Sequence, residues 1–141
     1  MGVIRGRLVA RPRAHPHPRH GCGRGRCVAA EHALTGYVQA VRTTSYRLPL
    51  SEQAELLVWF VTEHGEVVSY SVVLTAQHDG VWHTVRVYDN AHNENEFHRH
   101  TLLGGKQPAE RFLPGDPGTA MRAARAEVLA GYDTMIEAWR S

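Results

Sequence analysis

Long hydrophobic runs are missing from this sequence. The longest apolar stretch, residues 56–61, is far too short to cross a bilayer. Arginines interrupt the first residues, where a secretory signal needs an apolar core. We therefore predict a cytoplasmic protein without a membrane partner. Cysteine is scarce as well: Cys22 and Cys27 are the two cysteines of the sequence, spaced as Cys-x4-Cys, and the second such spacing that a structural zinc site needs is missing.

Acidic residues are nearly absent from the first third of the chain. The net charge of +2 hides a segment up to Arg47 of about +8 and a remainder of about −6. Proline, glycine, histidine and arginine dominate the beginning, which offers little apolar surface to offset the entropy of ordering. We predict a disordered basic tail over residues 1–30 and a single domain over residues 31–141. An upstream start codon, which would make the tail an artefact of translation, is the alternative.

Alternating apolar residues predict four strands, at residues 56–63, 67–77, 81–89 and 97–103. The glycine of His64-Gly65 suits a tight hairpin between the first two strands, and Asp79-Gly80 is a stronger hairpin signal between the next two. Residues 31–46 are compatible with either a helix or a strand. Pro49 favours a connection over residues 48–52, because proline cannot donate in a central ladder.

One long helix closes the chain. Asp116 is a preferred N-cap residue and Pro117 suits the first helical position. A stripe at helical spacing follows, formed by Met121, Ala124, Val128, Tyr132, Met135 and Trp139. The predicted fold is α+β: a four-stranded, mostly antiparallel sheet, arranged as a meander, with one long C-terminal helix packed on one face.

Charged and titratable residues cluster around the turn between the third and fourth predicted strands. They are Arg86, Asp89, His92, His98, Arg99, His100 and Lys106. If these strands pair antiparallel around the loop at residues 90–95, Asp89 or His92 comes near His98. Alternation places His98 and His100 on one face and Arg99 on the other.

These residues carry a resemblance to a known family. The succession Tyr88-Asp89-Asn90, then His98-Arg99-His100, then Pro108 and Phe112, then a terminal helix with an aromatic residue near its end resembles the TumE-type toxin family of bacterial toxin–antitoxin systems. The chain is also similar to small bacterial proteins that share a W-x-x-V-x-x-Y-D-x-A-H core. The resemblance covers about residues 55–139. It implies a sheet-plus-helix fold and a toxin that a partner antitoxin restrains.

The residue types in the cluster match what a metal-independent ribonuclease needs. Cleavage of an RNA phosphodiester requires a base, an acid and cations for the phosphorane charge. His98 and His100 lie about 7 Å apart along an extended strand and are the predicted base and acid. The predicted site, without cofactor or metal, has as catalytic residues His98, His100, Asp89 and His92, and as substrate-binding residues Arg86, Arg99 and Lys106.

Three other interpretations stay open. Two imidazoles at positions i and i+2, with His92 or Asp89, can bind a transition metal. The cluster can also be a polar sheet face without chemistry. Finally, the protein can be a non-enzymatic interaction module, antitoxin-like, whose sheet face binds a partner. A homodimer is a further expected assembly.

Overall fold

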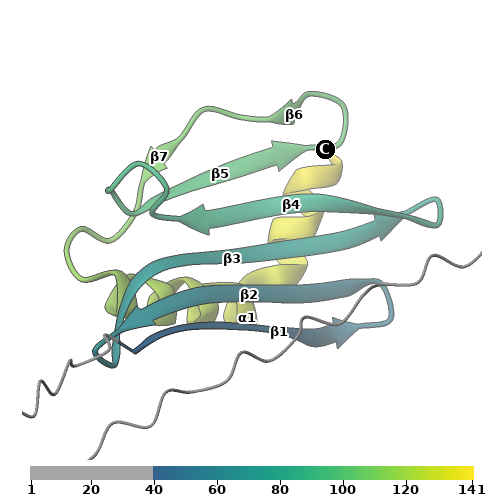
Figure 1. Cartoon of the computed structure of the whole chain (residues 1–141). Coiled ribbons are helices and arrows are strands. Elements are labelled where there is room, and N and C mark those ends of the chain that lie inside the picture. The colour runs from purple at the N-terminus through teal and green to yellow at the C-terminus, as the bar shows by residue number, and fades with distance from the viewer. Residues whose placement is uncertain (1–39) are drawn as a thin grey trace, which may run out of the picture. The chain divides into compact units, whose positions relative to one another are not determined.

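A computed structural model describes residues 40–141 of the chain (Figure 1). The elements are, in order, β1 (Val41–Ser51), β2 (Ala54–Glu63), β3 (Glu66–His78), β4 (Val81–Asp89), β5 (Glu96–Thr101), β6 (Gly105–Lys106), β7 (Glu110–Arg111) and α1 (Pro117–Arg140). The strands form an antiparallel sheet in the order β1-β2-β3-β4-β5-β6, and β7 also pairs with β5. The predicted tail, residues 1–30, lies outside the described residues.

The α+β class, the antiparallel sheet and the C-terminal helix on one face are confirmed, but four strands is wrong, because the sheet has seven. The segment predicted as a connection around Pro49 belongs to β1, and the pairing with β2 shifts register between Pro49 and Ser51. An edge strand tolerates proline because it has a neighbour on one side only. β6 and β7 have two residues each, too few for alternation to reveal them.

Two tight hairpins join β2 to β3 and β3 to β4. His64 and Gly65 have φ angles of 50° and 81°, and Asp79 and Gly80 have φ angles of 51° and 76°. Positive φ at both central positions is the turn geometry that matches the twist of the flanking strands. Both predicted hairpins are confirmed, and they fix the order of the three central strands.

α1 packs its apolar stripe on one face of the sheet. Asp116 caps the helix by accepting a hydrogen bond of 2.8 Å from the Thr119 N–H, and Pro117 is the first helical residue. The buried helical side chains are Ala120, Ala124, Val128, Met135, Ile136 and Trp139. They form one core with strand residues that include Leu56, Val58, Tyr70, Val72, Leu74 and Tyr88.

The last turns of α1 lie over the sheet region that contains the candidate site. The helix is interrupted at Gly131, which has non-helical angles, and then runs toward the end of β5 (Figure 1). There the Leu102 N–H donates a hydrogen bond of 2.8 Å to the Trp139 carbonyl. The rings of His78 and His83 lie 6.2 Å and 5.5 Å from the Trp139 ring, centroid to centroid. These contacts anchor the C-terminal end of α1 to the end of β3, to β4 and to the residue that follows β5.

The opposite face of the sheet carries no further layer within residues 40–141 (Figure 1). Trp59 of β2 is 40% exposed there, opposite Ser45 of β1 and Ser71 of β3. In the same part of the chain, no helix is both long and apolar enough to span a membrane.

Candidate functional site

The pairing of β4 with β5 decides which of the predicted site residues meet. Arg86 lies opposite Arg99, and Val87 lies opposite His98. Residues directly opposite each other on paired strands point to the same face. The two arginines therefore share one face, and His98 is on the other. Because Arg86 reaches Glu127 of α1, the arginines lie on the face that α1 covers.

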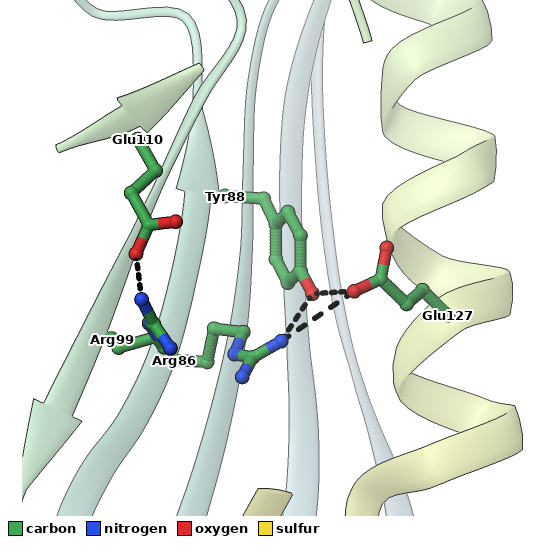
Figure 2. A network of polar contacts seen from close by, with 5 residues as sticks. All are labelled: Arg86, Tyr88, Arg99, Glu110 and Glu127. Atoms are coloured by element: carbon green, nitrogen blue, oxygen red, sulfur yellow. Dashed lines mark hydrogen bonds and ion pairs between the residues drawn. The ribbon is translucent and has the colours of Figure 1, made fainter. Parts of the chain in front are cut away.

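A polar network connects β4 to α1 on the face of the sheet that α1 covers (Figure 2). The hydroxyl of Tyr88, a fully buried residue, donates a hydrogen bond of 2.9 Å to Glu127 Oε1. Arg86 Nη1 donates to the same hydroxyl at 3.3 Å and lies 3.5 Å from Glu127 Oε1. Burial raises the pKa of Tyr88 to about 12, although the Arg86 guanidinium acts against it. The phenol therefore stays protonated and acts as the donor to Glu127.

Arg99 forms a second ion pair beside the first. Its guanidinium donates to Glu110 of β7, and Figure 2 shows this pair next to the Arg86 network. Phe97, on the same strand face as Arg99, lies under the Arg86 guanidinium at 5.5 Å from ring centroid to Cζ. Tyr88 and Phe97 also stack, with centroids 5.7 Å apart. The aromatic rings thus support Arg86 from below while acidic groups hold both cations.

A cavity of about 430 Å³ opens between β4, β5, the segment after β6 and the last turns of α1. We call it the arginine pocket. Its lining residues are Val85, Arg86, Arg99, His100, Thr101, Gln107, Pro108, Glu110, Met135, Ala138 and Trp139. The pocket therefore brings together three of the seven predicted site residues: the two arginines and one histidine.

Two residues that line the arginine pocket have side-chain nitrogens without a hydrogen-bond partner among residues 40–141. The Arg86 side chain is 16% exposed, and among residues 40–141 only its Nη1 has hydrogen-bond acceptors. His100 Nε2 is buried and has no partner in the same part of the chain. Burial lowers the pKa of His100, and the positive charge of Lys106, its cross-strand neighbour, acts in the same direction, as does His98. The His100 imidazole is therefore neutral at physiological pH.

The remaining predicted catalytic residues lie elsewhere. His98 is 6% exposed, and its Nδ1 lies 3.2 Å from the Gln107 carbonyl oxygen. Asp89 lies opposite Glu96, and its carboxylate accepts a hydrogen bond of 3.0 Å from the Ala91 N–H. The exposed His92 contacts Glu96 at 3.2 Å. The β4–β5 register places Val87 directly opposite His98 and Asp89 opposite Glu96, so Asp89 lies on the same face as His98 but two residues along the strand. The approach of Asp89 or His92 to His98 stays a prediction.

Sequence reasoning did not identify four members of this site: Tyr88, Glu110, Glu127 and Trp139. Alternation along residues 81–89 already predicts that Tyr88 shares a face with Arg86, and this signal was available. Trp139 belongs to the predicted core stripe, where its additional position at the pocket has no sequence signature. Glu110 and Glu127 reach the arginines only through the path of β7 and the crossing of α1, which no local pattern encodes.

The metal interpretation receives no support from the described residues. Residues 40–141 contain no group of three or more histidine, cysteine, aspartate or glutamate side chains that could hold a metal ion. The guanidiniums of Arg86 and Arg99 instead make the arginine pocket an environment for an oxyanion.

Comparison with known proteins assigns the chain to a family. Residues 40–140 match the model of the domain of unknown function DUF7718, so the chain belongs to this family. None of the curated proteins and none of the solved structures matches the chain. The resemblance to TumE-type toxins is not tested by these comparisons and stays a prediction.

Proposed function

We propose that this member of the DUF7718 family binds a small organic anion in the arginine pocket, with the phosphate or carboxylate of the ligand on Arg86. The observation that carries the proposal is the state of Arg86, which is largely buried yet uses one of its three nitrogens among residues 40–141. A guanidinium presents its donors as a planar fork that matches two oxygens of a carboxylate or phosphate. Such a ligand would satisfy the donors that the chain leaves open.

The surroundings hold Arg86 in place without neutralising it fully. Tyr88 and Glu127 both engage Nη1, and the Glu127 side chain is 46% exposed, so water screens its charge. The ring of Phe97 lies 5.5 Å from Arg86 Cζ and attracts the cation from one side. This arrangement orients the unused nitrogens before a ligand arrives, which reduces the entropy lost on binding.

The lining of the arginine pocket indicates what else the ligand carries. Val85, Met135 and Trp139 provide apolar walls next to the charged groups. A volume of about 430 Å³ falls in the range of pockets for ligands of nucleotide or drug size. The acidic balance after Arg47, about −6, disfavours a long polyanion. These features favour a small ligand with one anionic group and an apolar or aromatic body.

A second candidate function is metal-independent cleavage of RNA by a toxin that an antitoxin restrains. It is favoured by one observation: His100, neutral because of its lowered pKa, lines the same pocket as Arg86 and Arg99. A neutral imidazole is a suitable base for the attacking hydroxyl, the guanidiniums suit a phosphodiester, and solvent water would supply the proton for the leaving oxygen. Because His98 is buried against a carbonyl, His100 is the predicted catalytic histidine on which this candidate depends.

Titration calorimetry with three probes tests the binding proposal. Adenosine monophosphate, benzoate and adenosine represent a phosphate ligand, a carboxylate ligand and an uncharged control. We expect at least one anion to bind while adenosine does not, and Arg86→Gln to weaken that binding about tenfold or more. The matched control is Arg125→Gln, which removes an exposed arginine of α1 and should leave affinity unchanged. Equal affinity in wild type and Arg86→Gln would rule the site out.

A further inference from the structure

The two edges of the sheet differ in how far their backbone groups are paired. The outer edge of β5 is covered: β6 pairs at His100 and Thr101, and β7 pairs at Glu96 and Phe97. β1 forms the other edge and pairs only with β2 among residues 40–141 (Figure 1). Every second residue of β1 therefore presents its N–H and C=O groups outward, in the row that can accept another strand.

β1 has few of the features by which proteins protect an edge. Pro49 and the register shift lie at its C-terminal end, which leaves residues 41–48 as a regular, accessible strand. Val41 and Tyr46 are 58% and 39% exposed, and most of the other side chains of β1 are exposed too. The threonines and the tyrosine have high strand propensity. An accessible strand of this composition is suited to pairing with another chain.

We propose that a second copy of this chain pairs antiparallel with β1 about a two-fold axis at Ser45, so that the two sheets become continuous. An isologous contact satisfies the free edges of both copies at once. With Ser45 opposite Ser45, Thr43 lies opposite Arg47 and Val41 opposite Pro49. The pairing region then ends where the proline would interrupt a ladder.

The charges along β1 favour this register. Arg42 would lie opposite Leu48 and Arg47 opposite Thr43, so no two like charges face each other. A shift of one residue in one direction would place Arg42 opposite Arg47, and a pair of like charges directly opposite is destabilising. A shift in the other direction would place Arg42 opposite Pro49, which cannot donate in a ladder. The Arg47 guanidinium is also matched within its own copy by Glu55, at 3.5 Å. The charges along β1 are thus compatible with the proposed alignment and disfavour one of the two neighbouring alignments.

The dimer does not depend on the proposed ligand site. β1 is one edge of the sheet, and the arginine pocket is lined by residues of β4 and β5. In the strand order, β2 and β3 lie between them (Figure 1). Loss of the dimer therefore leaves anion binding unchanged, and loss of anion binding leaves the dimer unchanged.

Sedimentation equilibrium of the full chain with charge-swapped variants tests the proposal. Ser45→Glu and Ser45→Lys each place two like charges directly opposite at the axis, and each should weaken the dimer about tenfold or more. An equimolar mixture of the two variants should restore the dimer, because opposite charges then meet. Restoration also shows that both variants are folded. The control Ser69→Glu, on β3 and away from the edge, should remain dimeric.

A monomeric wild-type chain would overturn the proposal. So would Ser45→Glu dimerising as strongly as wild type, or a mixture of the two variants that stays as weakly associated as each variant alone.

Discussion

Tyr88 of β4 and Glu127 of α1, 39 residues apart in the chain, are joined by a hydrogen bond of 2.9 Å between the phenol and the carboxylate. The bond ties the helix to the strand that carries Arg86. It also gives a fully buried hydroxyl a charged acceptor, which compensates for the loss of water around it. The geometry of the arginine pocket therefore depends on this contact.

Replacing Tyr88 by phenylalanine should lower the free energy of unfolding by about 1 kcal/mol, because the ring stays while the hydrogen bond to Glu127 is lost. Anion affinity should fall as well, since Arg86 loses one of the groups that orient it. Urea denaturation followed by circular dichroism measures the first effect. Tyr46→Phe, at an exposed position of β1, is the control and should stay within about 0.5 kcal/mol of wild type. Equal stability of Tyr88→Phe and wild type would contradict this account.

Truncation of Trp139 to alanine should cost about 3–5 kcal/mol, since the side chain is 2% exposed and closes the core between α1 and the strands. The same truncation of Trp82, which is 44% exposed, should change the free energy of unfolding by less than about 0.5 kcal/mol. Thermal or urea unfolding distinguishes the two. Similar losses for both variants would show that the end of α1 is not anchored as described.

His100 should make stability depend on pH. Its folded-state pKa is lowered from 6.5, mainly by burial, so the unfolded chain takes up this proton more readily than the folded chain. The free energy of unfolding should therefore decrease as pH falls below 6.5, and His100→Gln should flatten this decrease. Urea unfolding of both proteins between pH 5 and pH 8 gives the two pH dependences. Their difference should correspond to the uptake of at most about one proton on unfolding. Identical pH profiles would refute the assignment.

The ribonuclease candidate predicts growth arrest when the full chain is expressed in bacteria without an antitoxin. If His100 is the base, His100→Ala should restore growth and leave total RNA intact. His92→Ala should remain toxic, because this exposed residue lies in the β4–β5 turn and not among the lining residues of the arginine pocket. Harmless expression of the wild-type chain, with intact RNA, would remove this candidate and leave anion binding unaffected.

The sequence predicts local features of the fold well. Asp79-Gly80 forms its hairpin, and Asp116 and Pro117 begin the helix, because each depends on backbone preferences of the residues themselves. A strand over residues 41–46 remains one of two alternatives from the sequence, and the continuation of β1 to Ser51 is not predicted, because Pro49 argues against a strand unless the strand is known to lie at an edge. Edge or centre is a property of the whole sheet.

The candidate site was predicted only in part for a similar reason. The residue types point to an anion, and Arg86, Arg99 and His100 do meet in one pocket. Which histidine joins the arginines depends on the β4–β5 register, however, and Glu127 reaches Arg86 only because α1 crosses the sheet at a particular angle. Neither the β4–β5 register nor the way α1 crosses the sheet can be predicted from a local sequence pattern.

The most direct test of the central claim is the Nε–Hε signal of Arg86 in a ¹H–¹⁵N spectrum. Arg86→Lys, which lacks this group, assigns the signal by its disappearance. On titration with adenosine monophosphate or benzoate, the account predicts a saturable shift of the Arg86 signal, with the dissociation constant found by calorimetry, while the signal of Arg125 stays in place. An Arg86 signal that does not move up to about 10 mM of either anion would contradict the account.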